Sequence, residues 1–147
     1  MPLVSSVKNE TELADIRLRI LDIHLDLEAC MNRTLSIYAV DNAKKRNVDL
    51  NIYDILPKFE RFTFYKKITL IDALSLAPNS IGILTEINRL RNTLMHKTYP
   101  EYVDVFSIQE KRDVKYLGQV IPKEGIMTRL EDDRKKVIDE FSKNLSG

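Results

Sequence analysis

One short segment, Arg91-Asn92-Thr93-Leu94-Met95-His96, gathers the side chains of this sequence that could carry out chemistry. A histidine can give and take a proton near neutral pH, because its ordinary pKa lies there. An arginine can hold a phosphate with two parallel hydrogen bonds and stabilise charge that builds in a transition state. The amide of Asn92 can orient a hydroxyl group or a water molecule. Arg91, Asn92 and His96 therefore suffice for attack of an RNA 2′-hydroxyl on the neighbouring phosphate, with no metal or cofactor required.

The segment is predicted to lie on a helix that runs from about residue 79 to residue 97. Apolar residues fall on one stripe of that helix at a step of about 100° per residue. The stripe consists of Ile83, Ile87, Leu90 and Leu94. Polar residues follow one another at intervals of four, nearly opposite the stripe; they are Asn88, Asn92 and His96. One face of the helix can therefore feed a core while the other presents an arginine, two amides and a histidine.

The rest of the chain predicts more helices. Apolar residues at spacings of three and four predict a long first helix that starts near Glu10, and the basic run over residues 44–46 either closes this helix or starts the next loop. Thr63 is a suitable N-cap for a second helix, with Lys66 and Lys67 on its solvent side. Gly and Pro bound the other predicted elements: a short helix over 108–117, a last helix after Pro122, and an irregular connector of about one helical turn near residues 48–62. We expect one all-α domain over residues 1–147, an up-and-down bundle of four main helices plus one short helix.

The first helix carries a second apolar face, formed by Leu18, Leu21, Leu25 and Leu35. A surface helix of a small monomer seldom needs two apolar faces. Either this helix is central in the bundle or one face meets another chain. His24 and Glu28 also lie one turn apart on it, but a metal site needs at least a third ligand. We therefore expect His24 to be solvated or hydrogen-bonded, and we expect no metal.

Composition and missing motifs exclude several classes of protein. A net charge of +1 argues against a strongly basic coat that binds nucleic acid without specificity. The single cysteine, Cys30, excludes an internal disulfide and is expected to be a small buried residue. The sequence lacks a signal peptide, an apolar run of membrane-spanning length, a glycine-rich phosphate loop and a serine nucleophile elbow. These features favour a cytoplasmic protein.

The segment Arg91–His96 resembles the Arg-x4–6-His motif of the HEPN superfamily, whose members often have Asn directly after the Arg. The similarity extends over roughly residues 60–100, where a helix and a short turn precede the motif. The flanking helices match only in kind. In the subgroup paired with minimal nucleotidyltransferases a Tyr follows the His by two positions, whereas this chain has Thr98 there. The subgroup, and with it any antitoxin, is left unassigned.

The resemblance implies a helical bundle that forms a homodimer, with two Arg/His motifs meeting in one cleft. Many HEPN domains are metal-independent endoribonucleases of toxin–antitoxin, phage-defence or RNA-processing systems. Carried over here, Arg91 and His96 would be catalytic, and Asn88, Asn92 and Lys97 would bind RNA. Lys66, Lys67 and Arg89 are further basic residues that a cleft could use. The alternative is a non-catalytic regulatory or interaction module of the mannitol-repressor kind, which shares the bundle and a similar segment.

Overall fold

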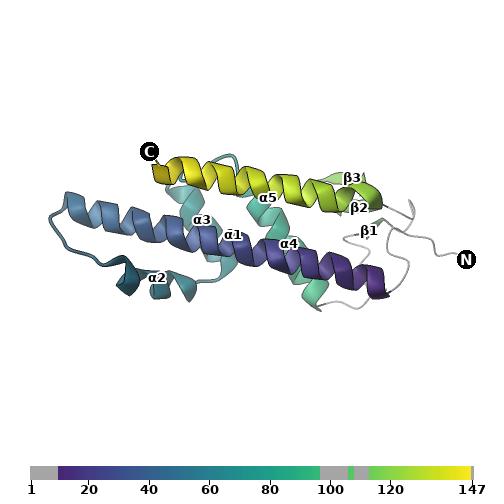
Figure 1. Ribbon diagram of the computed structural model, residues 1–147, viewed down its shortest axis with the longest axis horizontal. Coiled ribbons are helices and arrows are strands. Elements are labelled where there is room, and N and C mark those ends of the chain that lie inside the picture. The colour runs from purple at the N-terminus through teal and green to yellow at the C-terminus, as the bar shows by residue number, and fades with distance from the viewer. Residues whose placement is uncertain (1–9, 97–105, 108–112, 147) are drawn as a thin grey trace, which may run out of the picture. The chain divides into compact units, whose positions relative to one another are not determined.

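The computed structural model describes residues 10–96, 106–107 and 113–146, and the side chains of residues 15–93, 116–119 and 125–143. Its helices are α1 (Glu10–Lys45), α2 (Ile52–Glu60), α3 (Phe64–Ala73), α4 (Ile81–His96) and α5 (Lys123–Ser146) (Figure 1). Three short strands, β1 (Phe106–Ser107), β2 (Asp113–Tyr116) and β3 (Gln119–Pro122), come before α5. The predicted all-α helical bundle is thus confirmed. None of the described helices combines the length and the apolar character that a membrane span requires.

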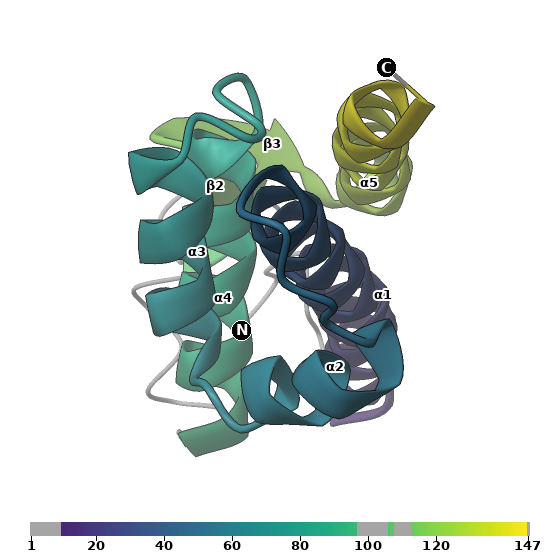
Figure 2. The ribbon, with the colours of Figure 1, turned by 90° about the vertical axis from the view of Figure 1, so that its left-hand side faces the viewer.

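The short helix lies elsewhere than predicted. It is α2, whose first turn is capped by Asn51, since the Asn51 side chain accepts a hydrogen bond from the backbone N–H of Tyr53 at 2.8 Å. The helix continues past Pro57. Figure 2 shows α2 as a separate element between the end of α1 and the start of α3. None of its residues is fully buried.

The predicted helix over 108–117 is wrong for residues 113–117; residues 108–112 lie outside the described ranges. Strand β2 pairs with β1 and β3 in an antiparallel sheet, with Tyr116 opposite Gln119. The two residues between them, Leu117 and Gly118, have φ angles of 53° and 74°. Positive φ at both central positions defines the tight hairpin turn that matches the twist of paired strands. Leu is an unusual residue for the first of these positions, so the turn was not apparent from the sequence.

The chain divides into two compact units, and α1, α4 and α5 each contribute residues to both. Unit 1 comprises residues 1–24 and 86–135. Its buried apolar residues include Ile16, Ile20, Ile23, Ile87, Leu90, Tyr116, Ile126 and Leu130. Ion pairs join Arg19 to Glu131 at 2.7 Å and Asp22 to Arg134 at 3.1 Å. Since both partners advance together along the chain, α1 and α5 run parallel here.

Unit 2 comprises residues 25–85 and 136–147. Its apolar core contains Leu27, Met31, Leu35, Phe64, Ile68, Ile71, Leu84, Val137 and Phe141. Thr63 caps α3 as predicted, accepting a hydrogen bond from the backbone N–H of Lys66 at 3.1 Å. Lys67 corrects the sequence analysis, which placed it on the solvent side of that helix. Its side chain is 1% exposed and its Nζ lies 2.7 Å from Glu28 Oε2.

Candidate functional site

Helix α4 carries the Arg/His segment, and its apolar face explains how the helix is held. Leu84, Ile87 and Leu90 are each at most 1% exposed. The predicted stripe began at Ile83, but Ile83 is only half-buried. The buried stripe begins instead at Leu84. Asn88 and Asn92 lie one turn apart on another face of the helix, and Arg91, one turn after Ile87, lies between that face and the buried stripe.

Arg91 and Asn92 are joined by a hydrogen bond. Arg91 Nη1 donates to the amide oxygen of Asn92 at 3.1 Å. The Nε atom of Arg91 is buried and has no hydrogen-bond partner among the described residues. A buried guanidinium N–H is costly to leave unpaired.

Asn88 contacts the histidine that the sequence analysis had set aside. His24 Nε2 lies 3.3 Å from Asn88 Oδ1, and both residues belong to unit 1. His24 is 6% exposed. The prediction that His24 would be solvated or hydrogen-bonded is confirmed, because His24 is hydrogen-bonded. The partner is 64 positions away in the sequence, so local spacing could not reveal it.

The amide oxygens of Asn88 and Asn92 each lie within hydrogen-bond distance of a protein nitrogen. Asn88 Oδ1 faces the ring nitrogen of His24, and Asn92 Oδ1 accepts from Arg91. Within the described residues, the Nδ2 groups of both amides have no hydrogen-bond partner. Together with the guanidinium group of Arg91, a half-buried residue, they form a cluster of N–H donors, which we call the donor face of α4: Asn88, Arg91 and Asn92. A face made of donors suits an anionic ligand such as a phosphate.

The remaining predicted site residues lie at or beyond the end of the described segment. The backbone of His96 forms the last residue of α4, but its side chain is outside the described residues, as is all of Lys97. The catalytic role of His96 and the RNA-binding role of Lys97 therefore stay predictions. The chain has two histidines, and both belong to unit 1.

Two of the further basic residues are engaged elsewhere. Lys67 is paired with Glu28. Arg89 donates through Nε and Nη2 to the two carboxylate oxygens of Glu86 at 2.6 and 3.0 Å. Lys66 is exposed, and its Nζ lies 4.4 Å from the centre of the Phe62 ring. The expectation that this whole set serves an RNA cleft is therefore wrong for Lys67, whose ammonium group is enclosed.

Glu86 connects α4 to the β2–β3 turn, and the sequence analysis did not single it out. Its Oε2 accepts a hydrogen bond from the backbone N–H of Leu117 at 2.6 Å. Burial raises the pKa of Glu86, but the hydrogen bonds from Arg89 and Leu117 outweigh that effect and lower it below its ordinary value. The charged carboxylate thus helps to hold the turn, and with it the neighbouring strands, against α4.

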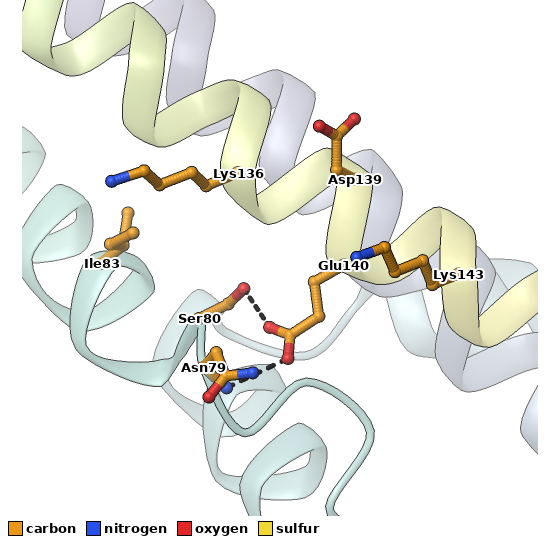
Figure 3. Close-up of a pocket in the computed structure, with 7 residues that line it drawn as sticks. All are labelled: Asn79, Ser80, Ile83, Lys136, Asp139, Glu140 and Lys143. Atoms are coloured by element: carbon orange, nitrogen blue, oxygen red, sulfur yellow. Dashed lines mark hydrogen bonds between the residues drawn. The ribbon is translucent and has the colours of Figure 1, made fainter.

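A hollow of about 460 Å³ in unit 2 is lined by residues of α5 and of the turn before α4. Figure 3 shows Glu140 reaching across it towards Ser80 and Asn79. Its carboxylate accepts hydrogen bonds from Ser80 Oγ at 2.5 Å and from the backbone N–H of Asn79 at 3.1 Å. The carboxylate thereby supplies the negative charge that a helix N-terminus favours. The polar groups of Asn79 and Ser80 in this hollow are therefore already bound by Glu140.

Comparison with known protein families, with curated proteins and with solved structures gives no match. Within the described residues no three side chains among His, Cys, Asp and Glu come together as a metal site would need.

Proposed function

We propose that the protein is a metal-independent endoribonuclease of the HEPN type, acting as a homodimer in the cytoplasm, in a toxin or defence system. The observation that carries the proposal is the donor face of α4, whose two amide oxygens each lie within hydrogen-bond distance of a protein nitrogen. That face favours a phosphodiester over a neutral or cationic ligand. It also lies on the same helix as His96.

The proposed reaction removes one proton from the RNA 2′-hydroxyl and delivers one proton to the leaving 5′-oxygen. A His96 imidazole takes the proton of the RNA 2′-hydroxyl as the 2′-oxygen attacks the adjacent phosphorus. The bond from phosphorus to the 5′-oxygen breaks, and a second imidazole protonates that oxygen. Arg91 and the two amides stabilise the extra negative charge on the phosphoryl oxygens. Since one chain offers one His96, the second imidazole comes from a second copy.

An exposed apolar pair on α1 supports the dimer. Leu18 is 65% exposed and Leu25 is 64% exposed, and they lie seven residues apart on one helix. Large apolar side chains at this spacing are typical of a seam between helices. They are part of the second apolar face that the sequence predicted, and Leu35 of the same set is buried instead.

The alternative function, a non-catalytic interaction module, is favoured by the pairing of Lys67 and Arg89 with acidic residues. This pairing leaves fewer cations to follow an RNA backbone. A module of this kind would form the same dimer but would not cleave RNA.

The test is cleavage of a varied set of RNAs in excess chelator. Arg91→Ala is expected to lower the rate by about 100-fold or more, as loss of one transition-state donor does. His96→Ala is expected to lower it by about 100-fold to 10,000-fold. Arg33→Ala is the matched control, because Arg33 is an exposed arginine in unit 2. Equal rates for all four proteins would refute the assigned residues, and absence of cleavage by the unaltered chain would favour the alternative.

A further inference from the structure

The contact between His24 and Asn88 goes beyond the predicted site. His24 comes from α1 and Asn88 from α4, and their side chains lie 3.3 Å apart within unit 1. His24 is almost fully enclosed, whereas Asn88 is half-buried and therefore has one side towards solvent. A buried imidazole behind a half-exposed amide can fix which end of that amide faces outwards.

We propose that His24 is a positioning residue of the RNA site, holding Asn88 so that its amide N–H groups face the RNA phosphate. The inference rests on the proposed function and names one more residue of that site. In this proposal His24 carries a proton on Nε2 and donates it to Asn88 Oδ1, 3.3 Å away, which a histidine can do both as the Nε2–H tautomer and as the imidazolium. The contact therefore survives proton uptake by the ring.

The geometry of a planar amide gives this contact its consequence. With the oxygen of Asn88 directed at His24, the Nδ2 group must point away from it. An amide without such a partner can rotate and offer its oxygen to the phosphate, which repels it. A donor that is already oriented costs no reorganisation when the negative charge develops. Arg91 orients the amide of Asn92 in the same way, because its Nη1 donates a 3.1 Å hydrogen bond to Asn92 Oδ1.

A buried histidine that only links two helices is the simpler explanation, and the two roles predict different results for Asn88→Asp. The aspartate keeps an oxygen for His24 but has no N–H to offer. A purely structural contact would therefore be preserved or strengthened in Asn88→Asp. A positioned donor would be lost, and a negative charge would face the phosphate instead.

The experiment measures kcat and KM for RNA cleavage, with thermal unfolding of every variant as the check on folding. Asn88→Asp is expected to unfold near the temperature of the unaltered protein and to lose at least about tenfold in kcat/KM. His24→Gln, which keeps an N–H donor, should remain within about threefold. His24→Leu should lose about tenfold in the native background and nothing further in an Asn88→Ala background. Asn42→Asp on α1 is the matched control for the added charge.

Two results would overturn the role of His24 alone. They are an Asn88→Asp protein as active as the unaltered chain, and a His24→Leu loss that is repeated in full when Asn88 is already Ala. If His24→Leu does not fold, His24→Met, which also has no N–H donor, takes its place in both backgrounds. Failure of the proposed function looks different, because Arg91→Ala would then match the unaltered protein or no protein would cleave RNA. In that case the positioning role falls with it.

Discussion

In the proposed site, Asn88 and Asn92 favour an anion because their amide oxygens face the protein and their amide nitrogens do not. Each amide has one acceptor and one donor end, so a free asparagine does not distinguish an anion from a cation. His24 Nε2 lies 3.3 Å from Asn88 Oδ1, and Arg91 Nη1 donates to Asn92 Oδ1 at 3.1 Å, so both amides contact the protein through their oxygen ends. The four-residue spacing of Asn88 and Asn92 predicted that they share one face of the helix. It could not predict the contacts of the amide oxygens, since the His24 contact joins distant parts of the chain.

Asn92→Asp tests the donor face at this scale. The change replaces two N–H donors by a negative charge, so affinity for a short single-stranded RNA should fall by about tenfold or more. Fluorescence anisotropy with a labelled RNA measures it, in a background that also carries His96→Ala to prevent cleavage. Asn42→Asp serves as the control for charge. Unchanged affinity in Asn92→Asp would mean that RNA does not contact this face.

Tyr116 predicts a pH dependence of stability. Burial, together with the hydrogen bond that its hydroxyl donates to Asp133 at 2.7 Å, raises the pKa of Tyr116 above its ordinary value of 10. The unfolded chain therefore loses this proton first, so the contribution is complete below about pH 10 and declines as the pH rises further. Tyr116→Phe should lower the free energy of unfolding by about 1–3 kcal/mol at pH 7 and flatten the alkaline decline.

Urea unfolding between pH 7 and pH 11 checks this expectation. Tyr53→Phe is the control, because Tyr53 is 79% exposed. An alkaline decline in Tyr116→Phe as steep as that of the native chain would contradict the assignment.

At the scale of elements, the β2–β3 hairpin shows where local pattern was insufficient. Thr63 predicted the start of α3, and the apolar stripe predicted α4, because capping and helical periodicity are local signals. The hairpin depends on a turn with Leu at a positive φ, which Glu86 of α4 stabilises through the Leu117 N–H. Similarly, Lys67 is enclosed because Glu28 of another helix neutralises it. Such tertiary partners override the local preference.

Two glycine substitutions separate turn from helix. A Cβ at either Gly118 or Gly82 would meet no atom within 4 Å, so only the backbone decides the outcome. Gly118 has φ of +74°, and alanine there should cost about 1–2 kcal/mol. Gly82 is the second residue of α4, and alanine there should stabilise the protein by less than the roughly 1 kcal/mol expected in a helix interior. Chemical denaturation of both variants measures the difference, and shifts of the same sign would contradict these assignments.

The Lys67–Glu28 pair predicts strong non-additivity. Glu28→Leu leaves an enclosed ammonium group without its carboxylate and should destabilise by about 3 kcal/mol. Adding Lys67→Met to that variant should restore most of the loss, because an apolar pair replaces an ionic one. Lys66→Met, on an exposed neighbour, is the control. Denaturant unfolding of the set measures the coupling, and additive losses would show that the two side chains do not depend on each other.

For the whole molecule, the proposed nuclease needs two copies. Leu18→Glu combined with Leu25→Glu should shift a dimer towards monomer by about tenfold or more in the dissociation constant, since two exposed leucines would otherwise be buried in the seam. Sedimentation equilibrium measures this, and Tyr65→Glu, at an exposed position of α3, is the control. A native chain that is monomeric at all concentrations tested would contradict the shared site.

The chemistry of the RNA ends tests the central claim most directly. Attack by the 2′-hydroxyl leaves a 2′,3′-cyclic phosphate on one fragment and a 5′-hydroxyl on the other. We expect these ends from the native chain and from Arg33→Ala in excess chelator, with the yield lost in Arg91→Ala and His96→Ala. Cleavage that yields 3′-hydroxyl ends, or cyclic phosphate formed equally well without Arg91 and His96, would contradict the account.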